Sequence, residues 1–106
     1  MEIIIKAKNA KLAPEAHEII TKKINKLTRY CDCIIKADVE IGVTTFHHQK
    51  GDIYRAEVNL AVPKKIIRAE AETDTIDKSI SEMLKRLKAE LIKYKQKHGF
   101  HGASQK

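Results

Sequence analysis

The C-terminal stretch Thr75–Lys97 constrains the fold most, because it is the longest uninterrupted amphipathic pattern in the chain. Its apolar residues recur at spacings of three and four, which places them on one stripe about 100° wide on a helix. These residues are Ile76, Ile80, Met83, Leu84, Leu87, Leu91 and Tyr94. Asp74 or Thr75 can cap the first turn, and Gly99 follows a last turn rich in lysine. We therefore expect one long helix that packs its stripe against a core.

The rest of the chain contains one further helical pattern and four β-rich runs. A helix is predicted over Pro14–Tyr30, since proline suits a first helical turn and apolar residues repeat behind it at helical spacing. Strands are predicted where apolar and charged residues alternate, at Glu2–Lys8, Ile34–Val43, Ile53–Val62 and Ile66–Thr73. The order β-α-β-β-β-α predicts an α+β fold. Its four-stranded, mostly antiparallel sheet would carry two roughly parallel helices on one face.

The length of 106 residues suits a single domain with a modest core. We expect residues 1–97 to form this domain and residues 98–106, which contain Gly and Ser, to form a disordered tail. No apolar run approaches the roughly 18 residues of a membrane span. The first residues, MEIIIKAKN, place Glu before the apolar run and Lys after it, unlike a signal peptide. We therefore expect a cytoplasmic protein.

The cysteines and histidines do not complete a recognisable metal or catalytic site. Cys31 and Cys33 lack the further ligands of a zinc site, so we expect two reduced thiols at a helix–strand junction. Two histidine pairs lie in the loop at residues 44–51 and near the C-terminus, without a thiolate or carboxylate cluster beside them. No phosphate-binding glycine loop or nucleophile motif is present. We expect no enzyme, no cofactor, no metal and no small-molecule substrate.

The net charge of +7 indicates a polyanionic partner, with nucleic acid ahead of an anionic membrane surface. The predicted fold separates the charges, because exposed positions on the two helices hold eleven bases and five acids. The first helix carries an uninterrupted basic strip formed by Lys22, Lys23, Lys26 and Arg29. Charge that served solubility alone would not be expected to divide in this way. Because few exposed aromatic residues could stack on bases, the pattern favours recognition of folded or double-stranded RNA by backbone and shape.

The basic residues of the last helix lie on two flanks. One flank holds Lys78, Lys85, Lys88 and Lys95, with Asp77 as its only acid. The other flank holds Arg86, Lys93 and Lys97, mixed with Glu82 and Glu90. Spacing alone therefore favours the first flank for RNA, with Lys85 and Lys88 as its candidate contacts.

The element order, the length and the segment DTIDKSISEMLKRLKAELIKYKQK resemble the ribosome hibernation-promoting factor family. This family is also known as ribosome-associated inhibitor or sigma modulation protein. Its last helix typically carries a pattern like K-L-x-x-Q-L-x-K-Y-K, which corresponds here to residues 86–95. The first helix, with Pro14, Lys23, Lys26, Leu27 and Arg29, also resembles the family's basic first helix. The resemblance covers about residues 2–97 and implies a fold like a double-stranded-RNA-binding domain with an extra first strand.

The resemblance also implies a function and a set of contacts. Members bind rRNA of the small ribosomal subunit in the channel for mRNA and tRNA, and thereby inhibit translation and stabilise idle ribosomes. Carried over by position, the rRNA contacts would be Lys23, Lys26 and Arg29, with Arg86 and Lys93 favoured over Lys85 and Lys88 on the last helix. The protein would be monomeric off the ribosome and would bind no membrane. Two alternatives stay open: a general module for structured RNA, and a modulator of a transcription sigma factor.

Overall fold

The computed structural model describes residues 1–8, 11–44, 51 and 53–98. The predicted loop at 44–51 and the predicted tail at 98–106 fall almost entirely outside these residues, as do His47, His48 and His101. His98, the first residue of the predicted tail, is instead the last residue of the C-terminal helix. The four strands are β1 (Glu2–Lys8), β2 (Lys36–Thr44), β3 (Ile53–Val62) and β4 (Lys65–Thr73). The helices are α1 (Pro14–Lys26), which continues as the short 3₁₀ helix η1 (Leu27–Arg29), and α2 (Ile76–His98).

The four strands form one sheet in the order β1-β2-β3-β4. β1 pairs in parallel with β2, with Ile3 opposite Ala37, because the α1 crossover brings the chain back to the same end of the sheet. β2, β3 and β4 pair as antiparallel neighbours, with Val39 opposite Val58 and Val58 opposite Ala69. These pairs place the small and β-branched side chains of three strands on one face. The predicted mostly antiparallel sheet is therefore confirmed as a mixed sheet with one parallel pair.

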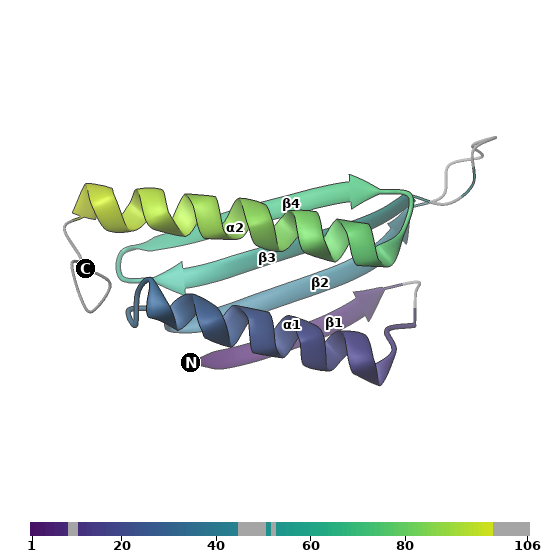
Figure 1. Ribbon diagram of the computed structural model, residues 1–106, viewed down its shortest axis with the longest axis horizontal. Coiled ribbons are helices and arrows are strands. Elements are labelled where there is room, and N and C mark those ends of the chain that lie inside the picture. Colours follow the sequence, from purple (N-terminus) through teal and green to yellow (C-terminus); the bar gives the residue numbers. More distant parts are fainter. Residues whose placement is uncertain (9–10, 45–50, 52, 99–106) are drawn as a thin grey trace.

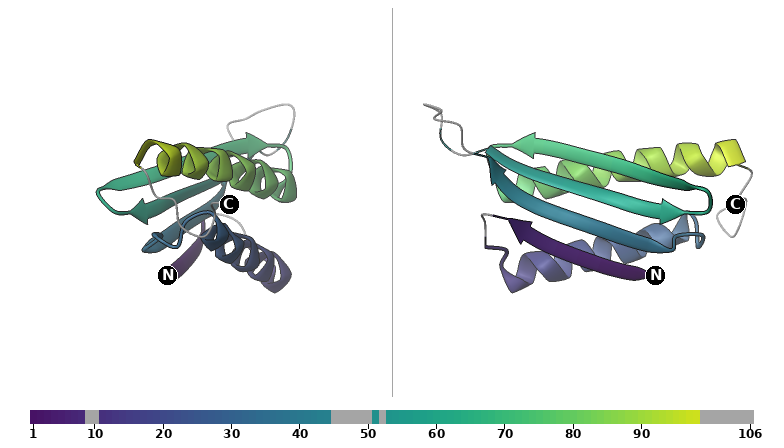
Figure 2. Two further views of the ribbon diagram at one scale, coloured as in Figure 1. Left: turned by 60° about the vertical axis from the view of Figure 1, so that its left-hand side comes forward. Right: turned by 180° about the vertical axis from the view of Figure 1, so that it is seen from behind.

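Both helices lie on the same face of the sheet and run in the same direction (Figure 1). The opposite face carries no helix, as the view from behind shows (Figure 2). The core lies between the layers, and its largest fully buried side chains include Ile20, Ile24, Ile41, Leu60, Met83, Leu87 and Leu91. The predicted α+β class, the order β-α-β-β-β-α and the two parallel helices on one face are all confirmed.

The first helix ends earlier than the predicted Tyr30. Its regular α-helical part stops at Lys26, and Leu27–Arg29 continue as one 3₁₀ turn that Tyr30 closes by donating its N–H to the Leu27 carbonyl. A tighter last turn is common at helix ends, where the carbonyl groups lack helical partners. This turn brings the side chain of Tyr30 beside the last positions of α1, a placement that uniform helical spacing did not predict.

The two cysteines lie at the predicted helix–strand junction, but their bonding differs from the prediction. Cys31 is buried behind η1, and the structure joins it to Cys33 as a disulfide, where the sequence favoured two reduced thiols. The N–H of Cys33 also donates to Cys31 Sγ, because the chain turns sharply between η1 and β2. The spacing of one residue gave no indication of this turn.

The start of α2 is fixed by hydrogen bonds of two hydroxyl side chains, Thr75 and Ser79. Thr75 caps the helix, since its hydroxyl accepts the Lys78 N–H at 3.1 Å. Ser79 is fully buried, accepts the N–H of Thr73 at 3.1 Å and donates to the carbonyl of Tyr54 at 2.7 Å. Because Tyr54 and Thr73 face each other at one end of the β3–β4 ladder, the Ser79 hydroxyl bridges this pair and ties α2 to it.

Candidate nucleic-acid interface

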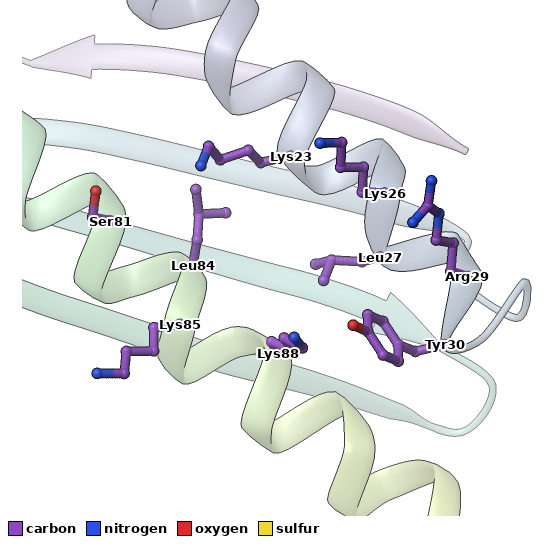
Figure 3. A pocket seen from close by; sticks show the side chains of 9 residues that line it. All are labelled: Lys23, Lys26, Leu27, Arg29, Tyr30, Ser81, Leu84, Lys85 and Lys88. Atoms are coloured by element: carbon purple, nitrogen blue, oxygen red, sulfur yellow. The ribbon is translucent and has the colours of Figure 1, made fainter. Parts of the chain in front are cut away.

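Basic side chains from both helices meet at a cleft of about 340 Å³ between α1 and α2 (Figure 3). We call this the interhelical cleft; its lining residues are Lys23, Lys26, Leu27, Arg29, Tyr30, Ser81, Leu84, Lys85 and Lys88. Five of the eight site residues predicted from the sequence therefore converge on one feature. Lys22 is exposed on the same strip of α1 but does not line the cleft.

The interhelical cleft has an apolar floor and a cationic rim. Leu27 from η1 and Leu84 from α2 form the floor, and both belong to the buried core. Lysine and arginine side chains stand around this floor, and Figure 3 shows Lys26 and Lys85 extending away from each other at its two edges. Long cationic side chains commonly cover apolar surface with their methylene groups while the charged end stays in water. The cleft thus combines a small apolar surface with a ring of positive charge.

Tyr30 and Lys88 connect the two sides of the cleft. The Lys88 ammonium lies 5.1 Å from the centre of the Tyr30 ring, within the range of a cation–π contact. A hydrogen bond from Lys88 lowers the pKa of Tyr30, and the charges of Lys88 and Arg29 act in the same direction against the opposing effect of burial. The phenol at this position therefore lies in a positive local field, which also attracts external anions.

The five cations of the cleft have no carboxylate partners among the described residues. Within the part of the chain that the structure describes, Lys23, Lys26, Arg29, Lys85 and Lys88 form no ion pair. Charges that lie close together without counterions repel one another, and an incoming anion removes this repulsion. The cleft therefore offers positive charge that no ion pair within the described part of the chain offsets.

Arg86 and Lys93, which the family pattern favoured, lie on the opposite flank of α2, which we call the β4 flank. Arg86 donates to the backbone carbonyl of Glu70 at 2.7 Å and pairs with Glu82 at 3.4 Å, so its guanidinium helps to dock α2 on β4. Lys93 lies 3.5 Å from Glu90. The structure thus does not bring these two residues together with the basic strip of α1.

The uncovered face of the sheet carries charges that are largely paired with one another. Arg55 contacts Glu57, Glu70 and Glu72, and Arg68 contacts Glu57 and Glu70. Burial alone would lower the pKa of Arg55, but the neighbouring carboxylates outweigh it and raise the pKa above the ordinary value. Lys8 and Glu40 form a further pair at 3.3 Å. Charges on this face therefore pair across the strands, and its described residues present little unpaired positive charge.

Sequence reasoning missed three parts of the cleft. Tyr30 was predicted only as the last residue of the first helix, whereas the 3₁₀ turn sets it half-buried at the cleft. Ser81 carried no charge to mark it, and Leu84 was assigned only to the core stripe. The sequence did contain one indication that Ser81 and Leu84 belong to the site: on a helical wheel they lie on the same flank of α2 as Lys85 and Lys88.

The described residues contain neither a metal-binding cluster nor a membrane-spanning helix. No cluster of three or more His, Cys, Asp or Glu residues among them could hold a metal ion. None of the described helices is both long enough and apolar enough to cross a membrane.

The fold and the site together define a small α+β domain with one strongly cationic, helix-bearing face. The chain belongs to the family described as "Sigma 54 modulation protein / S30EA ribosomal protein", whose match covers residues 3–99. The family membership suggested by the sequence is therefore confirmed. This family consists of ribosome-associated factors and not of enzymes, so the expectation of a non-enzymatic protein is also confirmed.

Individual relatives agree with this assignment. The chain is 24% identical over 97 residues to the ribosome hibernation promotion factor of Bacillus subtilis (strain 168), covering 92% of this chain and 50% of that protein. The chain thus spans about half the length of this curated relative. A ribosomal subunit interface protein from Coxiella burnetii has the same fold, with a TM-score of 0.79, 22% identity and coverage of 91% and 99% of the two chains. The N-terminal domain of Protein Y from Thermus thermophilus matches with a TM-score of 0.74, 23% identity and coverage of 89% and 99%.

Proposed function

We propose that this domain binds rRNA of the small ribosomal subunit and acts as a non-catalytic translation inhibitor and hibernation factor. The observation that carries the proposal is the convergence on the interhelical cleft of five cations from both helices that form no ion pair with the described residues. RNA-binding surfaces need such charge because each neutralised phosphate releases counterions from the RNA. Family membership supports the ribosome as the source of that RNA. The name of the Bacillus subtilis relative supports the role in hibernation.

We further propose that the cleft side of α2 makes the principal contacts. Lys85 and Lys88 share the cleft with Lys23, Lys26 and Arg29, so that one RNA segment can touch both helices at once. Arg86 and Lys93 are engaged with Glu82, Glu70 and Glu90, and binding through them would first require these pairs to open. We therefore assign Arg86 and Lys93 a secondary role, together with Lys22 at the outer edge of the strip.

The finer parts of the proposal follow the family. The domain would bind in the channel of the small subunit where mRNA and tRNA lie, as a monomer and in the cytoplasm. Recognition would rest on phosphate contacts and on the shape of folded rRNA, because the uncovered face of the sheet has its charges paired internally. Affinity for the ribosome should therefore fall steeply as the salt concentration rises.

Co-sedimentation with purified small subunits at low and high salt tests this proposal. The wild-type domain should travel with the subunits at low salt and dissociate at high salt. Lys23→Glu combined with Lys26→Glu should abolish binding without loss of folding, since both side chains are exposed. A control with the same charge change, Lys6→Glu combined with Lys11→Glu, alters exposed lysines outside the cleft and should retain binding.

The same experiment separates the two competing functions. A general module for structured RNA would bind arbitrary duplex RNA as tightly as it binds the subunit. A modulator of a sigma factor, the other role in the family's description, would bind its protein partner in a manner that survives high salt. Equal binding of the subunit by the Lys23→Glu, Lys26→Glu protein and the wild type would refute the proposed site.

A further inference from the structure

The floor of the interhelical cleft is the outer edge of the buried core, and it adds apolar surface that contacts to phosphates do not use. A surface that reads only the RNA backbone needs cations, yet this cation ring surrounds the side chains of Leu27, Leu84 and Tyr30. The cavity volume of about 340 Å³ lies within the range of small-molecule sites, which are mostly apolar with a few polar groups at their edge. The ligand that fits this arrangement has a flat, weakly polar part and an anionic part close to it.

We infer that the cleft is a subsite for one nucleotide, with the base on the floor and its phosphates at the rim. Leu27 and Leu84 offer the base apolar contact from the two helices, and the ring of Tyr30 closes one side (Figure 3). The lysines of α1 and α2 stand on either side of this floor, where phosphates on the nucleotide would extend. This inference rests on the proposed function and adds base contact to what would otherwise be backbone recognition alone.

Ser81 supplies the polar group that such a subsite requires. Its side chain is exposed, lines the cleft and forms no hydrogen bond with any residue in the described part of the chain. A hydroxyl group can both donate and accept, so Ser81 can meet a base edge or a ribose hydroxyl. On the other side of the floor, Lys88 already contacts the Tyr30 ring, and a base placed beside them would extend this cation–π arrangement.

The same chemistry can come from two sources. One is an unpaired nucleotide of the RNA partner, whose base can leave the stack and enter a protein pocket. The other is a free nucleoside triphosphate, which would compete with RNA for the rim lysines. Both place a base on the floor, and both differ from a sugar phosphate, which brings only the anionic part.

NMR titration of the isotopically labelled protein tests the inference directly. The probes are ATP, AMP, ribose 5-phosphate and a single-stranded oligonucleotide of adenosines, all at constant ionic strength. AMP should shift the resonances of Tyr30, Ser81 and Leu84 and should bind about tenfold more tightly than ribose 5-phosphate, as loss of one stacked base predicts. Equal affinity for AMP and ribose 5-phosphate would show that only charge is recognised and would overturn the inference.

A variant that fills the cleft without changing its charge provides the second test. Ser81→Phe places a bulky ring over the floor from an exposed position and should weaken AMP binding about tenfold, the same loss of base contact. Gln96→Phe adds the same ring at an exposed position of α2 outside the cleft and should leave AMP binding unchanged. Equal effects of the two substitutions, or none from Ser81→Phe, would overturn the inference.

Competition between the probes identifies the source of the nucleotide. If the oligonucleotide displaces ATP at a lower concentration than ATP needs to displace the oligonucleotide, the subsite is assigned to RNA; the opposite result assigns it to a free nucleotide.

Co-sedimentation with small subunits distinguishes failure of the subsite from failure of the proposed function. If the subunits bind but none of the nucleotides does, the subsite is wrong and the function stands; if AMP binds but the subunits do not, the function is wrong and the subsite stands.

Discussion

Replacement of Ser79 by alanine gives a prediction whose sign depends on the structure. On helix propensity alone, serine to alanine in a helix interior should stabilise the protein by about 0.5 kcal/mol. In the structure, however, the Ser79 hydroxyl is fully buried, accepts from the N–H of Thr73 and donates to the carbonyl of Tyr54. The alanine variant would leave this donor and this acceptor without their present partner.

The expected magnitude follows from those two groups. A buried polar group that loses its partner costs about 1–3 kcal/mol. Thr73 Oγ1 keeps its hydrogen bond to the carbonyl of Thr75, and the strand ends can partly close, so we expect a net loss of about 1–2.5 kcal/mol. For a domain of this size, the loss corresponds to a fall in Tm of roughly 5–15 °C.

Chemical denaturation and thermal unfolding of Ser79→Ala measure this loss. Ser81→Ala is the matched control, because Ser81 lies on the same helix but is exposed and forms no hydrogen bond with the described residues. It should change stability by no more than about 0.5 kcal/mol. A Ser79→Ala protein as stable as the wild type, or more stable, would refute the role of this hydroxyl in joining α2 to β3 and β4.

Two further predictions concern the core and the cleft. Leu87→Ala removes a fully buried side chain of α2 and should cost about 2–5 kcal/mol in chemical denaturation; an unchanged midpoint would contradict the orientation of the helix. Lys88→Ala should raise the pKa of Tyr30 toward its ordinary value, as followed by NMR of the tyrosine ring, because the hydrogen bond and charge that lower it are lost. In the wild type the folded-state pKa of Tyr30 is lowered, so the associated stabilisation is present above the unfolded-state pKa and is lost as the pH falls through the folded-state pKa. Lys88→Ala should weaken this pH dependence, and an unmoved Tyr30 pKa would contradict the contact.

Most of the fold could be predicted from periodicity. The stripe of α2 runs from Ile76 to Tyr94, about five helical turns, and the alternation of β3 matches the observed strand at both ends. Each of these patterns is local and is set by one buried face. The end of α1 could not be predicted in this way, because the 3₁₀ turn at Leu27 and the turn at Cys31 depend on how the chain packs behind the helix.

The basic residues of the candidate site could be predicted from the sequence, but not which of them lie together in space. The sequence identified the basic residues of both helices. On a helical wheel these residues lie away from the apolar stripe, so their exposure could be predicted. Which flank of α2 faces α1 depends on how the two helices sit on the sheet, and that is a tertiary property. Arg86 illustrates the difference, since its hydrogen bond to the Glu70 carbonyl joins residues 16 positions apart that no local pattern relates.

The salt dependence of small-subunit binding for two charge-matched variants tests the central claim most directly. Lys23→Gln with Lys26→Gln removes two charges from the cleft, whereas Arg86→Gln with Lys93→Gln removes two charges from the β4 flank. Each lost phosphate contact should reduce the slope of log K against log salt by about 0.7–0.9, so the cleft variant should lose about 1.5 from its slope. The β4-flank variant should keep most of the wild-type slope, and an equal or larger loss in that variant would contradict the interhelical cleft as the principal RNA-binding site.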